Sequence, residues 1–389
     1  MRLAISGQLG PAALISDEMA ETLKLCVSCK ACRRECPTGV DMARMKIEVQ
    51  AARAAKFELT LHEKLVGFLP HYAPYAARWH HFFNMRNRST ILRNASQLIA
   101  GFSSRRSLPK WRKDTYRDRS DWHYTSREEN ARAREVVLFA DTFNRYFERE
   151  NLDDALSVLV AGGYRVYAPL PANPDERPLC CGRTFLSVGL VDEARHEMQR
   201  TLDALAPYVA RGVPVVGLEP SCLFTFRDEL PALFKGKVVD DLAANALLFE
   251  EFIDREHKQG HLKLPLGPLP KKALLHGHCH QKAFDTMGAV ESALRLIPQL
   301  SVETIESSCC GMAGSFGYDP ATIDVSLKMA ELSLLPAVRR APADALIVAD
   351  GTSCRHQIHD GSGRDAAHVV RVLAMSLEAA SSKARPQSY

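Results

Sequence analysis

A run of four cysteines close to the N-terminus limits the fold of this chain more than any other feature of its sequence. The run is Cys26-x2-Cys29-x2-Cys32-x3-Cys36, and Pro37 follows it directly. Thiolates at this spacing can surround one [4Fe–4S] cluster from a single short loop, and the proline turns the chain away behind them. Zinc sites usually combine two separate Cys-x2-Cys hairpins, whereas this run is compact. The sequence therefore predicts a [4Fe–4S] cluster at these four cysteines.

The fourth cysteine of the run leaves two interpretations open. In proteins with two such clusters, the last cysteine of a run binds the other cluster. This sequence contains no second run of the same kind. Either Cys36 completes the cluster of its own run, or the matching run belongs to another polypeptide.

A second group of cysteines lies in the C-terminal half. It consists of Cys279, the pair Cys309-Cys310 followed by Gly311, and Cys354. Adjacent cysteines can reach two metal atoms, and a glycine beside them lets backbone amides approach the bound sulfide. Four thiolates are enough for one cluster. We therefore predict a second [4Fe–4S] cluster here, with zinc or a redox-active dithiol as the alternatives.

A third group contains only three cysteines, which are Cys180, Cys181 and Cys222. Thr142 stands at the position that corresponds to Cys279 in the second group. Three thiolates form an incomplete metal site. The sequence leaves open a metal site that Glu219 or Asp141 completes and a site that binds no metal.

Four histidines lie beside the second group. His276, His278 and His280 flank Cys279, and His356 follows Cys354 by two residues. A histidine next to a metal-binding motif more often donates a hydrogen bond than binds the metal. We interpret all four as hydrogen-bonding or structural residues. In an extended strand the first three would share one face, with the cysteine on the other.

The sequence changes character along its length. Residues 1–100 have helical patterns, with Ser16 capping one helix and a second helix beginning near Asp41. Residues 101–135 are crowded with charge and nearly empty of aliphatic side chains, which predicts a charged linker. From residue 136, short apolar runs alternate with helical stretches, a pattern typical of buried parallel strands.

The second half contains an internal repeat. VVLFADTF (136–143) aligns with ALLHGHCH (273–280), and each is followed by Cys-Cys-Gly and then by a single cysteine. Such self-similarity predicts two similar α/β units, over residues 136–255 and 265–380. The expected fold is α+β and multidomain, with a helical ferredoxin-like domain over residues 1–100 followed by the two pseudo-repeated units.

Residues 61–100 carry aromatic side chains at helical spacing. Aromatic stripes of this kind usually belong to a packed core, so we predict that they pack against another domain. A face for a quinone or a membrane is the alternative. The aromatic residues are Phe68, Tyr72, Tyr75, Trp79, Phe82 and Phe83.

Composition argues against several classes of protein. A net charge of +4 over 389 residues gives no sign of nucleic-acid binding. The N-terminus lacks the layout of a secretion signal, and no apolar run is long enough to span a bilayer. In a reducing compartment the 11 cysteines should be metal ligands rather than disulfides. We expect a cytoplasmic protein, either free or attached peripherally to the inner face of a membrane.

The cysteine repeats resemble CCG domains, which occur in the B subunit of heterodisulfide reductase and in the iron–sulfur subunit of glycolate oxidase. The family pattern is a cysteine, then Cys-Cys-Gly, then Cys-x-x-Cys. Both repeats match this pattern at the cysteines named above. The second repeat departs from it at Gly351, and the first departs from it at Thr142 and Glu219. These departures argue against the paired non-cubane clusters of heterodisulfide reductase, which need all five thiolates.

The stretch LCVSCKACRRECPTGVDMARMK (25–46) is similar to the C-terminal iron–sulfur half of large FAD-linked oxidases and dehydrogenases. These proteins act on D-2-hydroxy acids such as D-lactate or D-2-hydroxyglutarate. The resemblance extends from about residue 2 to residue 375. In that group a flavin domain precedes the part that resembles this chain. The resemblance implies that FAD lies on a missing domain or a partner chain, and that a quinone, a cytochrome or a carrier protein accepts the electrons.

The sequence and the resemblance together suggest an electron-transfer component of a flavin-dependent oxidoreductase. Its substrate would be a D-2-hydroxy acid of the lactate, 2-hydroxyglutarate or glycolate type. The chain itself carries no expected catalytic residue and should be inactive without a flavin-bearing partner. Two alternatives remain, namely a heterodisulfide-reductase-like enzyme that acts on thiols and a zinc-stabilised interaction module without enzymatic activity.

Overall fold

Two parallel β-sheets occupy the second half of the chain. The computed structural model describes residues 2–10, 12–118, 133–173 and 175–384. Within these residues, one four-stranded sheet has the order β2-β1-β3-β4 and the other the order β6-β5-β7-β8. The strands are β1 (Glu135–Phe139), β2 (Arg165–Tyr167), β3 (Val215–Gly217), β4 (Ala246–Leu248), β5 (Lys272–Leu275), β6 (Ser301–Thr304), β7 (Leu346–Val348) and β8 (Ala366–Ala367).

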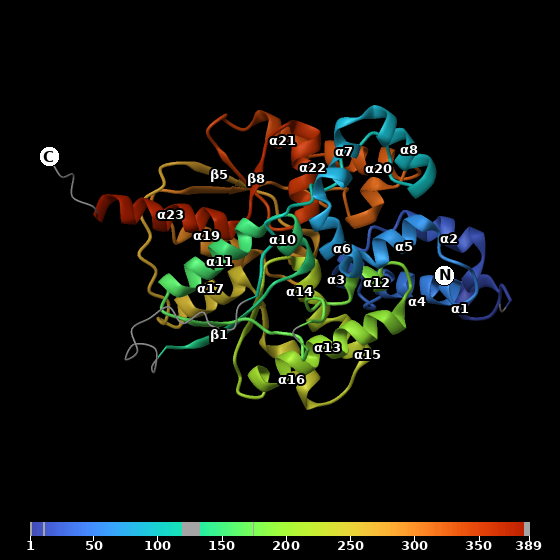
Figure 1. Ribbon diagram of the computed structural model, residues 1–389, viewed down its shortest axis with the longest axis horizontal. Helices are drawn as coiled ribbons and strands as arrows, with labels where there is room; N and C mark the ends of the chain where they lie inside the picture. Colours follow the sequence, from blue (N-terminus) through green and yellow to red (C-terminus); the bar gives the residue numbers. More distant parts are fainter. Residues whose placement is uncertain (1, 11, 119–132, 174, 385–389) are drawn as a thin grey trace.

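The two sheets repeat one topology. In each, the first strand along the chain lies second in the sheet, between the second strand and the third. All neighbouring strands are parallel, with Phe139 opposite Gly217 in one sheet and Leu275 opposite Val348 in the other. Most strands are short apolar runs because helices cover both faces (Figure 1), whereas the edge strand β6 is polar and partly exposed. The prediction of parallel α/β structure after residue 136 is confirmed, while the domain boundaries stay a prediction.

Helices alternate with the strands in both sheets. In the first half they are α10 (Thr142–Tyr146), α11 (Arg149–Ala161), α12 (Arg183–Leu186), α13 (Val191–Val209), α14 (Pro220–Arg227), α15 (Glu229–Leu233), α16 (Lys237–Asn245) and α17 (Phe249–Lys258). In the second half they are α18 (Cys279–Ala283), α19 (Met287–Arg295), η2 (Gly314–Tyr318), α20 (Ile323–Glu331), α21 (Leu334–Arg340), α22 (Thr352–Ser362) and α23 (Val369–Ala384).

The two sheets share one hydrophobic core. Leu138 and Leu156, from the first sheet and α11, belong to the same buried cluster as Leu275 and Leu373, from the second sheet and α23. Figure 1 shows the terminal helix α23 lying along α11 and α19. The last helix of the chain thus packs on the first α/β unit, so the two units are held together by apolar burial.

The N-terminal region is helical, as predicted. Ser16 caps the helix α2 by accepting a hydrogen bond from the Met19 amide, and Asp41 caps α4 through the Arg44 amide. The cysteine run lies between these two helices. The helices of this region are α1 (Arg2–Ile5), η1 (Ala13–Ile15), α2 (Asp17–Lys24), α3 (Ala31–Glu35), α4 (Met42–Ala54), α5 (Leu61–Gly67), α6 (Leu69–Arg78), α7 (His80–Arg88) and α8 (Thr90–Ala100).

The helical region packs closely on the first α/β unit. The Gln50 side chain of α4 donates a hydrogen bond to the Ser187 carbonyl oxygen at 2.9 Å. A Cβ atom at Gly189 would lie 2.4 Å from the Gln50 backbone, and the φ angle of Gly189 is +81°. Only glycine permits this close approach of two backbones.

The aromatic stripe of residues 61–100 divides into a packed part and an exposed part. Phe68 packs edge-on against Phe185, and Tyr72 packs against Trp111. In contrast, Trp79 is 65% exposed and Phe82 is 69% exposed. The prediction that the stripe packs against another domain fits Phe68, which meets the first α/β unit, and for the exposed side chains of α6 and α7 it stays a prediction.

Residues 101–118 pack against both α/β units although their composition is that of a solvated segment, and Trp111 and Tyr116 meet Phe147 and Arg145 of the first unit. The Ser103 amide donates to the Tyr318 carbonyl oxygen at 2.6 Å. Arg106 is buried, and its guanidinium donates to Gln357 Oε1 at 2.5 Å. The remainder of the predicted linker, residues 119–132, lies outside the described residues.

None of the described helices combines the length and the apolar character needed to cross a bilayer.

Candidate metal centres

The four cysteines of the second group meet at one edge of the second sheet. Cys279 begins α18 directly after β5, Cys309 and Cys310 follow β6, and Cys354 lies in α22 after β7. Parallel strands place the loops after their carboxyl ends at the same edge. The thiols form a chain of contacts, from Cys279 to Cys309, to Cys310 and then to Cys354. The structure therefore brings together all four residues that the sequence predicted.

Burial and mutual contact control the protonation of these thiols. The hydrogen bond with Cys309 and burial together raise the pKa of Cys279 well above its ordinary value. Although its contact with Cys279 acts in the opposite direction, contact with Cys310 and burial raise the pKa of Cys309 to about 12. A metal cation that binds such thiols displaces their protons.

A backbone N–H group of a glycine and the ammonium group of a lysine lie beside the thiols. The Gly311 amide donates to Cys309 Sγ at 3.4 Å, with a φ angle of +85° at the glycine. A Cβ atom at Gly311 would lie 2.3 Å from the Ser326 carbonyl oxygen, so the position requires glycine. The Lys282 ammonium donates to the Ser307 and Ser308 carbonyl oxygens and interacts electrostatically with all four thiols of the group.

Three of the four histidines near this site have structural roles. His278 caps α18, because its Nδ1 accepts a hydrogen bond from the His280 amide at 3.1 Å. His280 Nε2 lies 3.0 Å from the Ser28 carbonyl oxygen. His356 Nε2 lies 2.9 Å from Ser107 Oγ. Strand alternation does not apply to these residues, since β5 ends at Leu275.

His276 differs from these three histidines. Its Nδ1 lies 2.8 Å from Ser307 Oγ, and its Nε2 is buried without a hydrogen-bond partner among the described residues. Burial, followed by the charge of Lys282, lowers the pKa of His276 to about 3, so the ring is neutral. Donor atoms of His276, Cys310 and Cys354 all lie within 4.8 Å of one another.

The second repeat has Gly351 where the CCG pattern has a cysteine, and this difference has a steric explanation. A Cβ atom there would lie 2.4 Å from Cδ2 of His278 and 3.4 Å from Sγ of Cys354. The imidazole of His278 therefore fills the space in which a side chain at position 351 would lie. A fifth cysteine at this position would require His278 to move.

The cysteine run between α2 and α4 is half-buried and shaped by hydrogen bonds. Cys26, Cys29 and Cys32 lie close enough to interact electrostatically, and the Met42 amide donates to Cys32 Sγ at 3.3 Å. Hydrogen bonds with Thr38 and with the Val40 amide lower the pKa of the Cys36 thiol. Its place in the ligand set stays a prediction.

A buried cluster of charges anchors the run to the first α/β unit. Lys30 has a left-handed backbone, with φ of 61°, and its side chain is 1% exposed. Its ammonium contacts Asp228 and lies 2.6 Å from Glu229 Oε1. Although burial acts to raise it, the charges of Lys30, Arg44 and Arg33 hold the pKa of Asp228 below its usual range. The sequence analysis did not identify this cluster.

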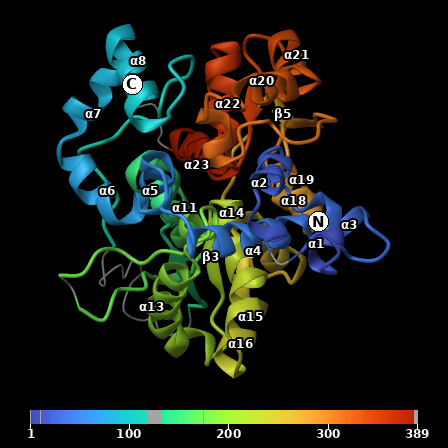
Figure 2. The same cartoon turned by 90° about the vertical axis from the view of Figure 1, so that its right-hand side faces the viewer.

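The two candidate centres are neighbours. Cys29 interacts electrostatically with Cys279, and Val27 packs against the buried cluster that contains Cys309, Cys310 and Cys354. Figure 2 shows α3, from the cysteine run, beside α18, which begins at Cys279. Segments about 250 residues apart in the sequence thus meet at one place.

The third group is also assembled. Cys180 contacts Cys181, Cys181 contacts Cys222, and Thr142 Oγ1 donates to Cys180 Sγ at 3.8 Å. The two carboxylates considered as a fourth ligand have other partners, which disfavours that role. Asp141 caps α10, and Glu219 caps α14 while accepting from the Thr352 amide at 2.8 Å.

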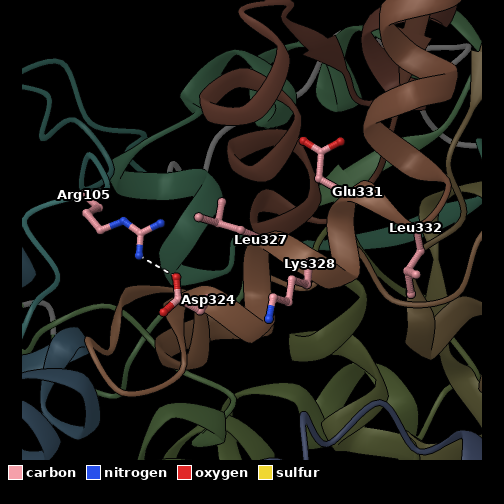
Figure 3. A pocket seen from close by; sticks show the side chains of 6 residues that line it. All are labelled: Arg105, Asp324, Leu327, Lys328, Glu331 and Leu332. Carbon is pink, nitrogen blue, oxygen red and sulfur yellow. Dashed lines mark hydrogen bonds and ion pairs between the residues drawn. The ribbon is translucent and has the colours of Figure 1, made fainter.

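Two surface hollows lie away from the cysteines. Figure 3 shows one, which lies beside α20. In its lining, the Arg105 guanidinium lies 2.6 Å from the Asp324 carboxylate. The other lies between α7 and α22 and is lined by residues such as Asn87 and His359. Neither hollow contains a cysteine among its lining residues.

Comparison with known proteins identifies relatives among dehydrogenases. No family model matches the chain. The chain is 28% identical over 298 residues to the C subunit of anaerobic glycerol-3-phosphate dehydrogenase from Escherichia coli (strain K12), an alignment that covers 75% of this chain and 72% of that protein.

The D-2-hydroxyglutarate dehydrogenases of Pantoea ananatis and Escherichia coli (strain K12) are 24% and 25% identical, over 369 and 365 residues. Each alignment covers 92% of this chain but 34% of the relative. The chain therefore spans about a third of the length of those dehydrogenases. These findings confirm the resemblance drawn from the cysteine motifs, and the chain is a homologue of a glycerol-3-phosphate dehydrogenase C subunit and of part of the D-2-hydroxyglutarate dehydrogenases.

Proposed function

We propose that this chain is the iron–sulfur electron-transfer component of a flavin-dependent dehydrogenase. One cluster would be held by Cys26, Cys29, Cys32 and Cys36, and a second by Cys279, Cys309, Cys310 and Cys354. The observation that carries the proposal is the proximity of these two groups, since Cys29 interacts electrostatically with Cys279 and α3 lies against α18. Two neighbouring sites, one half-buried and one buried, suit a relay from the protein surface towards its interior.

The residues at both sites fit iron–sulfur clusters. Thiolates are soft donors that select iron–sulfur clusters, zinc or copper(I), and the second group offers four of them in contact. The amides of Met42 and Gly311 donate to cysteine sulfur, which is a usual way to tune a cluster. A bound cluster would supply one-electron storage, so that a two-electron oxidation elsewhere can be divided into two steps.

The side chains around the sites would set the order of electron transfer. The Cys26–Cys36 run is half-buried and can be reached by a partner protein. The second group lies deeper, beside the ammonium of Lys282, whose positive charge favours the reduced form of a nearby cluster. We infer that electrons enter at the run and move on to the second group.

The substrate would be oxidised on a flavin-bearing partner. The relatives are named for dehydrogenation of glycerol 3-phosphate or D-2-hydroxyglutarate, and both of these molecules are small anionic alcohols. A D-2-hydroxy acid of the lactate, 2-hydroxyglutarate or glycolate type, or a polyol phosphate, is therefore the proposed substrate class. The acceptor would be a quinone, a cytochrome or a carrier protein.

The exposed face of α6, α7 and α8 is the proposed contact with a membrane. Leu98 is 87% exposed and Ile91 is 80% exposed, in addition to the aromatic residues of α6 and α7. From Lys64 to Lys113 the sequence has ten lysines and arginines and no aspartate or glutamate. Figure 2 shows these helices together along one outer edge. An apolar surface in a segment whose charged side chains are all positive suits an anionic lipid headgroup layer.

Metal analysis of the anaerobically purified chain tests the proposed function. We expect about eight irons and as many sulfides per chain, with visible absorption that dithionite bleaches. A colourless protein with bound zinc would favour the interaction module instead. Reduction of a mixed disulfide by the isolated chain would favour the heterodisulfide-reductase-like alternative.

A further inference from the structure

We propose that His276 is a nitrogen ligand of the cluster at Cys279, Cys309, Cys310 and Cys354, with Nε2 as the donor atom. This inference rests on the proposed function, because it concerns the same site. The sequence pattern favoured a hydrogen-bonding or structural role for this histidine. The structure supports a ligand role through three observations, which concern the distance, the orphaned nitrogen and the tautomer.

The first observation is the position of the imidazole. His276 directly follows β5, the strand that leads into Cys279, and it is 1% exposed. A donor atom of its ring lies within 4.8 Å of the sulfur atoms of Cys310 and Cys354. Three donor atoms this close to one another can face one metal atom.

The second observation is the buried Nε2 atom, which has no hydrogen-bond partner in the described part of the chain. Leaving a buried polar nitrogen without a partner is unfavourable. Nδ1 is already engaged with Ser307 Oγ at 2.8 Å, so Nε2 is the atom available to the thiol group. A metal atom at this place would satisfy it.

The third observation concerns the proton on the ring. Ser307 Oγ has a contact with the Ile305 carbonyl oxygen at 3.5 Å, to which only its hydroxyl hydrogen can donate. The serine oxygen is then free to accept a hydrogen bond from Nδ1–H of His276. This tautomer leaves a lone pair on Nε2, and metal-binding histidines commonly donate their other ring nitrogen in this way.

His280 also has a buried ring nitrogen without a hydrogen-bond partner among the described residues, its Nδ1, but His276 and not His280 is the histidine whose donor atom groups with Cys310 and Cys354. His280 directs Nε2 to the Ser28 carbonyl oxygen, and His278 uses Nδ1 to cap α18. With four thiolates and one imidazole available, a four-iron cluster would have one iron with two protein ligands. That iron should differ from the other three in its electronic environment.

Pulsed EPR of the reduced full-length chain tests the assignment without any substitution. The protein is prepared anaerobically with natural histidine and with 15N-labelled histidine. We expect a strongly coupled nitrogen whose signal changes from the 14N pattern to the 15N pattern on labelling. A weakly coupled nitrogen with an exchangeable proton would show that His276 only donates to sulfur and would overturn the proposal, as would the absence of any histidine coupling.

Two variants assign the signal to one residue. His276→Gln should lose the strong coupling, while His280→Gln, with the same chemical change beside Cys279, should keep it. Survival of the coupling in His276→Gln overturns the proposal. Mössbauer spectra of the 57Fe protein should show one distinct iron site that disappears in the same variant. If the wild-type chain contains no iron, the proposed function itself fails, whereas iron without nitrogen coupling removes only this inference.

Discussion

The Nε2 atom of His280 lies 3.0 Å from the main-chain carbonyl oxygen of Ser28. This contact joins the loop of the cysteine run to the helix that carries Cys279, beside the hydrogen bond that Arg34 donates to the Lys282 carbonyl oxygen. Both partners belong to segments that any electron transfer between the two candidate centres would cross. The contact is therefore a direct structural link between two parts of the proposed relay.

Replacement of His280 should loosen this link. In His280→Ala the Ser28 carbonyl loses its partner, and we expect a loss of about 1–3 kcal/mol in the free energy of unfolding. Anaerobic denaturant titration measures the loss, and EPR of the fully reduced protein should show weaker magnetic interaction between the clusters. The exposed His359→Ala is the control, with a change of about 0.5 kcal/mol or less. Equal losses in both variants would contradict the assigned role.

Lys30 should be essential for holding the cysteine run on the first α/β unit. Lys30→Met leaves the buried carboxylates of Asp228 and Glu229 with less positive charge, although Arg33 and Arg183 remain nearby. We expect a loss of about 3 kcal/mol in stability, because one partner of a buried ion pair has been removed.

The matched control for this prediction is Lys258→Met. Lys258 pairs with Asp254 one helical turn away, and its side chain is 68% exposed. Exposed pairs of this kind contribute little, so stability should change by about 0.5 kcal/mol or less. Denaturant unfolding of both variants gives the comparison, and a small loss in Lys30→Met would show that the arginines alone hold the run.

The third cysteine group should become a complete site when its missing thiol is supplied. Thr142 Oγ1 lies 3.8 Å from Cys180 Sγ, so a cysteine at this position would extend the contacts of Cys181 and Cys222. We expect Thr142→Cys to bind about four additional irons per chain, measured against the wild type in the same preparation. Thr322→Cys, another buried threonine, is the control and should leave the iron count unchanged. An unchanged count in Thr142→Cys would mean that the group is not a cluster site.

Motifs with local chemistry could be predicted from the sequence. The thiols at Cys279, Cys309 and Cys354 follow successive parallel strands, so the repeat pattern alone places them at one sheet edge. The caps at Ser16 and Asp41 depend on neighbouring amides only, and the structure places both as expected. Such features need no knowledge of distant parts of the chain.

Contacts between distant segments could not be predicted in this way. Lys30 meets Asp228 across 198 positions, and no periodicity signals such a pair. Arg106 lies in a charged segment yet is buried, because its partner Gln357 comes from the second unit. The aromatic stripe of residues 61–100 was expected to be covered, yet part of it is exposed. Amphipathic spacing indicates that a helix face is apolar but does not indicate what covers that face. From the sequence, His276 received the same hydrogen-bonding or structural role as its neighbours. In the structure, the buried Nε2 atom without a partner distinguishes it from His278.

His71 should make stability depend on pH. Burial, followed by the charges of Arg177 and Arg200, lowers its pKa to about 4. In the unfolded chain it titrates near the ordinary value of about 6.5. The unfolded state therefore takes up a proton between about pH 6.5 and 4 while the folded state does not, and stability falls as the pH is lowered through this range.

The size of this effect is limited because the His71 side chain is 35% exposed. Allowing for solvent screening, we expect the wild type to lose about 1 kcal/mol more than His71→Gln between pH 7 and pH 5. Denaturant titrations of both proteins at the two pH values test this. The same loss in both would place the pKa of His71 near its ordinary value.

The apolar face of α6, α7 and α8 should bind anionic vesicles. In Trp79→Ser/Phe82→Ser two exposed aromatic rings are removed, and we expect binding to phosphatidylglycerol vesicles to weaken by about tenfold or more. Co-sedimentation measures binding, and raised salt should weaken it in the wild type because the positive charges of the segment are then screened.

Leu332→Ser is the matched control for the membrane contact. Leu332 is 76% exposed but lies after α20, where Lys328 and Glu331 mix positive and negative charge. Its replacement should leave vesicle binding unchanged, because Leu332 lies outside the apolar face of α6, α7 and α8. If both variants bind as the wild type does, or if neutral phosphatidylcholine vesicles are bound equally well, the charge and apolar character of α6–α8 do not determine membrane contact. The exposed aromatic face would then be a surface for the flavin-bearing partner.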